Sequence, residues 1–375
     1  MRVLVAGNLA NMGFEIVKAL RKKKVDAKLL MPRYPHKYDD PKFMYPQLVK
    51  MSYPDWVFTY DNKNRSFSLN NWKFQVIREM RKDYDAIIAL TEFSIFAMFC
   101  GKPYGALSTG SDMRELAFEN SLKGFLYRLS YKFARLVIWG EPDKFYLVKK
   151  LGLERKAVFC TAPRNVNFQI RKIQKDDLKD KFVIFHPASQ HWRLKRNNLF
   201  LEAFEKLCSE RNDVYLIISE RGPDLEKAKK ILENGNAKNN YKFVPPLDAT
   251  QMEYHYNLCD VVVDQFGIGS MGMISMEAMK YAKPVILELD EESFRACYYN
   301  FPNSLINVGS SNEIYTKLKK LILNPKLCEE IGTKNRKWVD ENWDIEKLTN
   351  RYFDICEAIK KNDLKIIKEK DKIWK

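Results

Sequence analysis

Histidine and paired cysteine are scarce in this chain of 375 residues. It contains four histidines, none of them four positions from another, and seven cysteines that never form a C-x-x-C pair. Protein zinc sites and dithiol redox centres depend on such spacings. We therefore expect no bound metal, and the odd, scattered set of cysteines is typical of a protein kept in a reducing compartment.

Long apolar runs are missing as well. No segment approaches the roughly 20 uninterrupted apolar residues of a membrane-spanning helix. The first residues, MRVLVAGNLA, enter a predicted strand without the basic region of a signal peptide. Hydrophobic residues make up 46% of the chain and charged residues 30%, a balance that excludes wholesale disorder. We expect a folded, cytoplasmic protein.

Negative charge is scarce in the first half of the chain. Residues 1–170 contain 29 Lys and Arg against 16 Asp and Glu, whereas residues 171–345 contain 26 of each class. A positive field attracts anions such as phosphorylated molecules, acidic membrane surfaces or nucleic acid. A lysine-rich solubilising surface explains the same numbers equally well. Nucleic acid is not an expected partner, because the sequence has no nucleic-acid-binding motif.

Short apolar runs alternate with amphipathic segments of helical length along the whole chain, which is the rhythm of parallel βαβ units. At roughly 150 residues per domain, the length favours two domains. The predicted fold class is α/β, with two doubly wound Rossmann-like domains facing a central cleft. The predicted division is 1–165, 181–345 and 346–375, the last being a helix and basic tail that packs back on the first domain.

The predicted strands form two series. They are Arg2–Ala6, Val25–Leu30, Ala86–Leu90, Tyr104–Ser108 and Leu136–Trp139, then Phe182–His186, Val214–Ser219, Tyr241–Val244, Val261–Asp264 and Pro284–Glu288. Residues 31–75, rich in Pro, Tyr and charge, are predicted to be a long irregular insertion. A predicted helix at 121–139 carries one apolar stripe, which indicates core packing; its members are Leu122, Phe125, Leu129 and Phe133. The tail, KNDLKIIKEKDKIWK, fits either an anionic membrane surface or a solvated terminus.

A glycine-rich loop joins a buried strand to a helix in the second series. It holds Gly267, Gly269, Ser270 and Gly272, and the helix that follows carries Glu277. Glycines let the backbone approach a ligand closely, and the free N–H groups and positive dipole end of a helix favour phosphate. The segment therefore predicts an anion seat. Glu277 is placed to accept hydrogen bonds from sugar hydroxyls, with a helix-surface carboxylate as the alternative.

Two segments resemble one enzyme family. Residues 275–286, SMEAMKYAKPVI, resemble the LEAMA-x-G-x-PVI signature of retaining GT-B glycosyltransferases of the glycosyltransferase family 4 type. Residues 186–195, HPASQHWRLK, are similar to the donor-phosphate segment of that family, in which an Arg and a Lys five positions apart hold the diphosphate. Two positions depart from the pattern: Gly269 replaces the first of two glutamates, and Gln190 replaces the arginine.

The resemblance implies roles for individual donor-side residues. Lys195 would neutralise the leaving diphosphate with Arg193 assisting, and Glu277 would hold the ribose; a solvated helix-entry lysine is the alternative for Lys195. The sugar contact of the first family glutamate is either missing in this chain or supplied by Asp264, Gln265 or Ser270. The implied donor-binding residues are Gln190, Gly269, Ser270, Met271, Gly272, Glu277 and Asp264, with backbone amides of the loop holding the sugar or the β-phosphate.

The first domain carries the implied acceptor side. Gly7, Asn8 and Asn11 lie in a strand-to-helix loop that resembles the acceptor-side loop of GT-B enzymes. Residues 108–115, STGSDMRE, look like the H-G-S-D-L-R region of the family, which implies that Asp112 is catalytic. Capping of the following helix explains Asp112 equally well.

The function implied is that of a hexosyltransferase-like glycosyltransferase. It would move a sugar, with retention, from a nucleoside diphosphate sugar to a glycan or lipid-linked acceptor in polysaccharide or glycan biosynthesis. The nucleotide sugar is the co-substrate, and no cofactor is expected. The basic first half favours an anionic acceptor and a peripheral position at the inner membrane face. The alternatives are a nucleotide-sugar 2-epimerase of the same architecture and a non-catalytic binding protein on a degenerate transferase scaffold.

Overall fold

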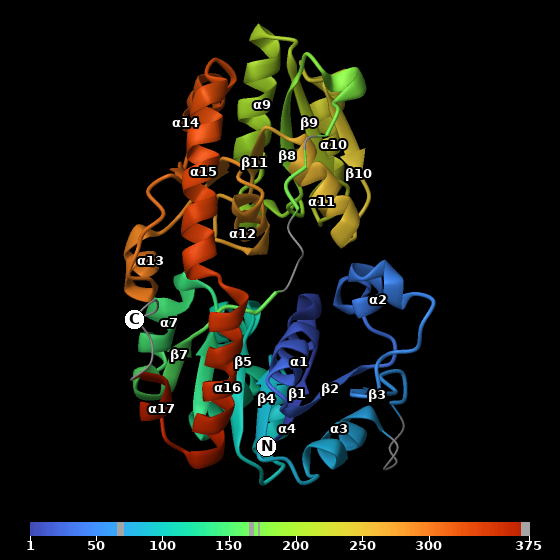
Figure 1. The fold of residues 1–375 in the computed structure, drawn as a ribbon, viewed down its shortest axis with the longest axis vertical. Helices are drawn as coiled ribbons and strands as arrows, with labels where there is room; N and C mark the ends of the chain where they lie inside the picture. The colour runs from blue at the N-terminus through green and yellow to red at the C-terminus, as the bar shows by residue number, and fades with distance from the viewer. Residues whose placement is uncertain (66–70, 165–168, 172, 369–375) are drawn as a thin grey trace. The chain divides into compact units, whose positions relative to one another are not determined.

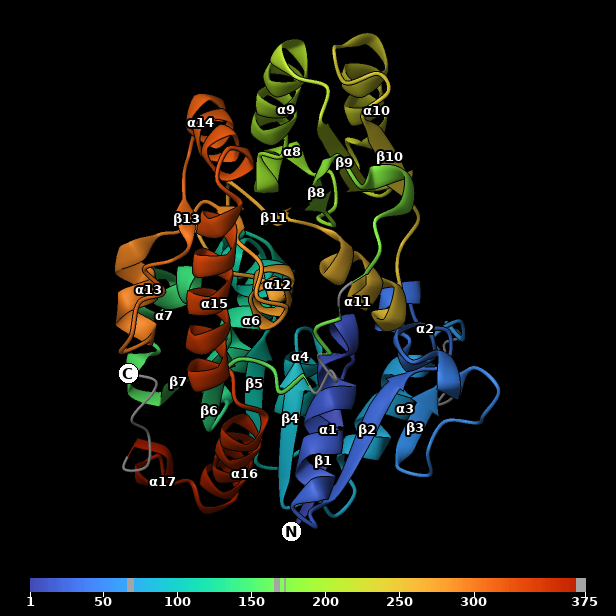
Figure 2. The ribbon, with the colours of Figure 1, turned by 45° about the horizontal axis from the view of Figure 1, so that its top comes forward.

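The computed structural model describes residues 1–65, 71–164, 169–171 and 173–368, and by residue contacts the chain divides into two units. Unit 1 comprises Met1–Asn165, Ala296–Tyr299 and Trp343–Lys375. Unit 2 comprises Val166–Arg295 and Asn300–Asn342. Each unit is built on a parallel β-sheet covered by helices (Figures 1 and 2). The prediction of two doubly wound α/β domains is confirmed.

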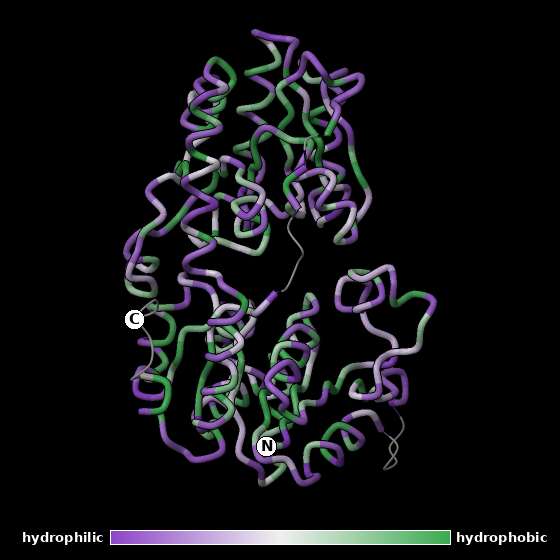
Figure 3. Tube along the Cα trace, viewed as in Figure 1, coloured by the Kyte–Doolittle hydropathy of each residue, from purple (hydrophilic) through white to green (hydrophobic). Residues whose placement is uncertain are grey.

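The sheet of unit 1 has seven strands in the order β3-β2-β1-β4-β5-β6-β7, all parallel. The strands are β1 (Arg2–Ala6), β2 (Asp26–Pro32), β3 (Val57–Tyr60), β4 (Ala86–Leu90), β5 (Tyr104–Ser108), β6 (Leu136–Trp139) and β7 (Ala157–Phe159). Helices cover both faces, so the central strands are almost continuously apolar and fully buried. Figure 3 shows these strands as mostly hydrophobic stretches of the trace.

The helices of unit 1 connect these strands. They are α1 (Met12–Lys22), α2 (Pro41–Met44), α3 (Trp72–Met80), α4 (Phe93–Met98), α5 (Ser111–Arg114), α6 (Leu122–Phe133) and α7 (Phe145–Lys150), followed after unit 2 by α16 (Ile345–Lys361) and α17 (Lys365–Lys368). The long C-terminal helix α16 packs beside α1 and over β4. Arg351 of α16 donates to the carbonyl of Phe159 at 2.9 Å, and Arg135 donates to the carbonyl of Ile359 at 2.7 Å. A Cβ added to Gly105 would lie 2.6 Å from Ile359 Cδ1, so α16 packs directly against this position of β5 and a side chain here would displace Ile359.

The sheet of unit 2 repeats the same winding with six parallel strands in the order β10-β9-β8-β11-β12-β13. The strands are β8 (Phe182–His186), β9 (Val214–Ser219), β10 (Tyr241–Val244), β11 (Val261–Val263), β12 (Val285–Leu287) and β13 (Ile306–Asn307). The helices are α8 (Trp192–Lys195), α9 (Asn198–Glu210), α10 (Leu225–Asn234), α11 (Ala249–Leu258), α12 (Met273–Lys280), α13 (Glu291–Cys297), α14 (Ser311–Ile322) and α15 (Pro325–Asn342). Loops from the carboxyl ends of β8, β9 and β11 therefore emerge side by side, because these strands are neighbours.

Three short strands are absent from the sequence prediction. β3 lies inside the segment 31–75, so the prediction that this segment is irregular throughout is wrong. β7 and β13 have three and two residues. All three are edge strands or next to linkers, where a short apolar run has no period that distinguishes it from a loop.

The apolar stripe of α6 does not pack in the core as predicted. Leu122, Phe125 and Phe133 are 75%, 49% and 62% exposed. The buried face of the helix instead consists of Gly124, Tyr127, Ser130 and Tyr131. The rings of Tyr127 and Tyr131 lie in the core of unit 1, and hydroxyl groups on that face have partners there, so this side of the helix packs inward.

No helix among the described residues is long and apolar enough to cross a membrane. Part of the basic tail, residues 369–375, lies outside the described residues.

Candidate functional site

Three adjacent strand ends of unit 2 bring the predicted donor-side segments together. β8 ends at His186, β9 is followed by the turn that holds Arg221, and β11 is followed by Asp264. The first two loops are tied to each other: the N–H of Gln190 donates to the carbonyl of Arg221 at 2.8 Å, and the N–H of Asp224 donates to the carbonyl of Gln190 at 3.1 Å. The close approach requires a glycine, since a Cβ on Gly222 would lie 2.2 Å from the Gln190 carbonyl oxygen.

His186 is the buried anchor of the first loop. Burial lowers its pKa to about 4, with Lys195 and Arg221 acting in the same direction, so the imidazole is neutral near pH 7. Its Nδ1 donates to the carbonyl of Val263 at 2.9 Å, and its Nε2 accepts from Asn197 Nδ2 at 3.0 Å. The other end of the Asn197 amide accepts from the N–H of His191 at 3.0 Å. This chain of bonds fixes the loop that leads into α8.

Asp264, the residue after β11, is a buried carboxylate that contacts the first turn of α12. It is 1% exposed, and Ser275 Oγ donates to it at 2.6 Å. Burial raises the pKa of Asp264, whereas the positive charges of Lys195 and Arg221 oppose that rise. Two cationic side chains from different loops are thus close enough to act on the same buried carboxylate. The N-terminal end of α12 is the predicted anion seat, and Asp264 already interacts with its first turn.

The glycine-rich loop folds tightly over this carboxylate. Gly269 has a φ of +69°, and a Cβ on Gly267 would lie 2.4 Å from the carbonyl oxygen of Leu194. Gln265 Nε2 donates to the carbonyl of Ser270 at 2.9 Å, which holds the loop from inside. Ser270 and Met271 are buried, and Gly272 is the N-cap of α12 without a side-chain cap. Gly267 and Gly269 are thus required for the shape of the loop, whereas a Cβ on Gly272 would make only ordinary contacts.

Two buried polar atoms of this site have no hydrogen-bond partner among the described residues. They are Ser270 Oγ and Gln190 Oε1, on side chains that are 1% and 0% exposed. The amide nitrogen of Gln190 donates to the carbonyl of Ala188 at 3.1 Å, so the amide is held with its oxygen unused. A buried polar atom without a partner costs free energy, and a bound ligand is one way to recover it.

Glu277 lies in α12 and is 5% exposed, so it is not a surface carboxylate. The hydroxyl of Tyr256, from α11, donates to Glu277 Oε2 at 3.0 Å. The Tyr256 ring in turn stacks on Tyr281 with centroids 5.2 Å apart. The carboxylate is therefore oriented by a packed aromatic pair.

The predicted cations differ in position. Lys195, the last residue of α8, is half-buried and acts on both His186 and Asp264. Arg193, two positions earlier in α8, is exposed. Arg221 was not predicted from the sequence; it is half-buried, and its guanidinium donates to the carbonyl of Pro187 at 3.4 Å. Its position directly after a central parallel strand is the signal that could have identified it.

The predicted unit 1 residues are held by their own surroundings. Asp112 is 2% exposed and accepts from the N–H groups of Thr109 and Gly110, at 3.2 and 2.8 Å, and from the hydroxyl of Tyr131 at 3.0 Å. These bonds fix the turn between β5 and α5, where the N-cap residue, Gly110, makes no side-chain cap. A catalytic role for Asp112 remains a prediction.

Asn8 and Asn11 tie the loop after β1 to the insertion that follows β2. Asn8 Nδ2 donates to the carbonyl of Asp39 at 2.7 Å, and Asn11 Nδ2 donates to the carbonyl of Tyr38 at 3.0 Å. Gly7, with a φ of +98°, makes the turn out of the strand. The predicted acceptor-side residues therefore shape one loop cluster, and their contact with an acceptor remains a prediction.

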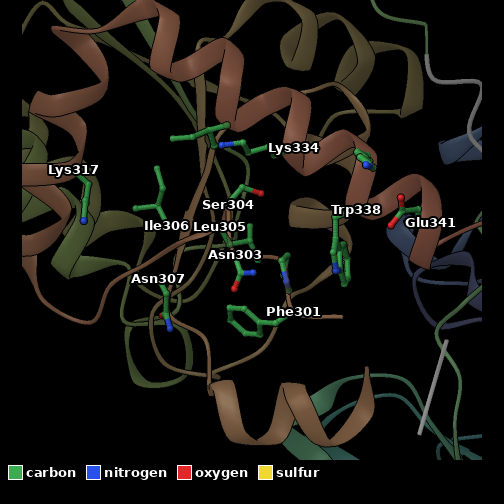
Figure 4. A pocket seen from close by; sticks show the side chains of 13 residues that line it. Phe301, Asn303, Ser304, Leu305, Ile306, Asn307, Lys317, Lys334, Trp338 and Glu341 are labelled. Carbon is green, nitrogen blue, oxygen red and sulfur yellow. The ribbon is translucent and has the colours of Figure 1, made fainter. Parts of the chain in front are cut away.

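Two other features of unit 2 bear on ligands. Among the described residues, no group of three or more His, Cys, Asp or Glu side chains is arranged to hold a metal. A cavity of about 840 Å³ beside β13 is lined by Phe301, Trp338, Lys317, Lys334 and neighbouring residues (Figure 4). None of the predicted donor-side residues lines this cavity.

Comparison with known proteins finds one matching family model and solved structures that resemble nearly the whole chain. Residues 166–338 match the family described as glycosyl transferases group 1. Over 96% of this chain and 100% of the other, the structure is similar to Anabaena Alr3699/HepE, crystallised with UDP-glucose, at a TM-score of 0.76 and 13% identity. The structure is also similar to sucrose-phosphate synthase from Thermosynechococcus elongatus, with a TM-score of 0.69 and 12% identity over 96% of this chain and 99% of the other.

A putative UDP-N-acetylglucosamine 2-epimerase from Listeria monocytogenes is also similar, with a TM-score of 0.61 and 14% identity over 95% of this chain and 96% of the other. The comparison with curated proteins finds no match. These structural likenesses show that the chain has the GT-B fold. Residues 166–338, most of which belong to unit 2, are similar to the glycosyl transferases group 1 family.

Proposed function

We propose that this chain is a glycosyltransferase that moves a sugar from a nucleoside diphosphate sugar to an acceptor. The observation that carries the proposal is the convergence of Lys195 and Arg221 with two buried polar atoms that lack described partners, at the ends of β8, β9 and β11. The match of residues 166–338 to a glycosyl transferase family supports it.

The diphosphate is the group that these cations suit. Lys195 and Arg221 come from separate loops and act on the same carboxylate, so an anion bound between them would meet two positive charges. In the transition state negative charge grows on the leaving diphosphate, and fixed cations stabilise it there more than in the ground state. We assign Lys195 and Arg221 to this role, with exposed Arg193 assisting from the rim.

The remaining donor contacts follow from the loop and α12. The backbone amides of Ser270, Met271 and Gly272 precede a helix, where N–H groups and the helix dipole favour phosphate. Glu277, oriented by Tyr256, accepts from the ribose hydroxyls. Gln190, whose side-chain oxygen is the second buried atom without a described partner, accepts from a donor group of the nucleotide sugar.

Ser270 takes the place of the family glutamate at position 269 in binding the sugar. Of the three candidates, Asp264 is engaged by Ser275 and Gln265 by the Ser270 carbonyl, whereas Ser270 Oγ has no partner among the described residues. A glutamate at position 269 would be strained, because φ is +69° and its Cβ would lie 3.2 Å from the Cβ of Asp290. This chain therefore meets the sugar with a hydroxyl instead of a carboxylate.

The acceptor side belongs to unit 1 in this proposal. Residues 1–170 carry the positive excess, which favours an anionic glycan or a lipid-linked phosphate sugar, and a cytoplasmic, membrane-peripheral location. Hexosyl transfer with retention is the reaction proposed, on the resemblance of residues 275–286 to retaining enzymes. Polysaccharide or glycan biosynthesis is the corresponding process.

Binding of UDP and UDP-glucose to the full chain is the first test. A ligand at 100 times its dissociation constant stabilises the protein by ~2.7 kcal/mol, which a thermal-shift assay detects. We expect Lys195→Ala and Arg221→Ala each to weaken UDP binding at least tenfold. Lys206→Ala, which removes the same charge from the exposed face of α9, should leave binding unchanged. Equal affinities in all four proteins would refute the assigned diphosphate site.

The reaction is tested by the products. A transferase releases UDP in proportion to glycosylated acceptor, and NMR of the new glycosidic bond reports retention. An epimerase converts UDP-N-acetylglucosamine to its 2-epimer without acceptor, and that result would replace the transferase proposal. Tight UDP binding without either product would identify the non-catalytic alternative.

A further inference from the structure

Helix α6 of unit 1 (labelled in Figure 2) exposes large apolar side chains, whereas its buried face consists of two tyrosine rings and two small residues. Toward the sheet it turns Gly124, Tyr127, Ser130 and Tyr131. Ser130 Oγ lies 2.9 Å from Ser94 Oγ, and the hydroxyl of Tyr131 donates to Asp112. A surface helix ordinarily keeps its large aliphatic and phenyl side chains in the core. The exposed apolar side chains of α6 are therefore a candidate binding surface.

The exposed apolar side chains of α6 lie next to one further exposed ring, that of Phe99. Leu122, Phe125 and Phe133 follow each other along the helix, and Phe99, after α4, is 54% exposed. Phe99 and Phe133 both line a hollow of about 500 Å³ whose wall also includes Leu126 and Leu129. Exposed large apolar side chains gathered in one place mark an interaction surface, unlike the scattered ones found on any protein.

The rim of this face is basic. The sequence of α6 contains Lys123, Arg128 and Lys132 and no acidic residue. Lys123 and Lys132 are exposed, and Lys102 and Arg135 line the hollow together with the aromatic rings. An apolar face bordered by Lys and Arg is the combination that binds an anionic bilayer, because rings enter the interface while cations meet lipid phosphates.

We propose that the exposed face of α6, with Phe99 and the basic rim, docks unit 1 on an anionic membrane surface. This docking surface is defined by Leu122, Phe125, Phe133, Phe99, Lys123 and Lys132. It rests on the membrane-peripheral location proposed above and names the face that contacts the bilayer, whereas it is independent of the transfer reaction. Binding to vesicles is measured without nucleotide sugar or acceptor. The docking proposal and the transferase proposal can therefore fail independently of each other.

The test is co-sedimentation of the full chain with vesicles of phosphatidylcholine alone or mixed with phosphatidylglycerol, over a salt series. We expect binding to the anionic vesicles that weakens as salt rises, because exposed charges are screened beyond ~8 Å at physiological ionic strength. Phe125→Ser with Phe133→Ser should lower the partition coefficient by ~10-fold or more, since both rings leave water on docking. Lys123→Glu with Lys132→Glu should lower it on anionic vesicles only.

Leu323→Ser is the matched control, because Leu323 is 67% exposed on unit 2 and lies outside the docking surface. All the altered side chains are exposed, so the fold should persist in every variant. Circular dichroism and UDP binding check this. Equal sedimentation of the native chain and the double serine variant would overturn the proposal. A native dimer that the serine variant dissociates, without vesicle binding, would instead assign this face to a second copy of the chain.

Discussion

Protonation of His186 should loosen the loop that carries Lys195. In the folded chain burial keeps the imidazole neutral with a pKa of about 4, whereas the ordinary value is 6.5. A charged imidazole would point an Nε2–H at the Asn197 Nδ2 donor 3.0 Å away. Turning the Asn197 amide over would then break its bond to the N–H of His191. At acid pH the Asn197 amide therefore loses its hydrogen bond either to His186 or to the N–H of His191.

The size of the effect follows from linkage. His186 is a base whose folded pKa is lowered, so its contribution to stability is complete above pH 6.5 and is lost as pH falls toward 4. One pKa unit corresponds to about 1.4 kcal/mol, so the stability of the surrounding structure should fall by roughly 2.5 kcal/mol between pH 7 and pH 4.5. His186→Gln removes this titration while keeping a polar side chain.

Hydrogen exchange of peptides covering β8 and β11 measures this loss locally, which suits a chain of two units better than a single unfolding midpoint. After correction for intrinsic exchange rates, the native chain should lose about 2.5 kcal/mol more protection than His186→Gln over that pH interval. The variant should start less protected at pH 7. Identical pH profiles for the two proteins would show that His186 is not held neutral.

Three other substitutions test separate parts of the structure. Glu277→Gln should weaken UDP and UDP-glucose binding by a similar factor, on the order of 1–3 kcal/mol for a hydrogen bond to a charged group. If calorimetry shows weaker binding of UDP-glucose alone, Glu277 contacts the transferred sugar and not the ribose. Gly269→Glu should lower UDP release and not raise it, because φ is +69° and the loop must shift; increased turnover would contradict the assignment of Ser270. Asp112→Ala should lower the thermal midpoint through ~1–3 kcal/mol of lost hydrogen bonds to Thr109, Gly110 and Tyr131, and an unchanged midpoint with lost turnover would favour catalysis.

Local sequence determined the sheets and the loop of unit 2. Buried parallel strands such as Ala86–Leu90 are apolar at every position, so their existence is legible without knowing their neighbours. The glycines before α12 and the segment 275–286 likewise identify a ligand loop, because close backbone approach requires residues without a side chain. The sequence does not predict the edge strands β3, β7 and β13, because strands of two to four residues are too short to show a hydrophobic periodicity.

Tertiary structure alone decided which groups meet and which face is covered. Arg221 acts on Asp264 only because β9 and β11 flank β8 in the sheet, although the two residues are far apart in the chain. The stripe of α6 has the spacing of a core helix, yet the other side of the helix packs inward, with the rings of Tyr127 and Tyr131 in the core and the hydroxyls of Ser130 and Tyr131 in hydrogen bonds. Periodicity shows that a helix has two faces, but the partners available in the folded chain determine which of them is buried.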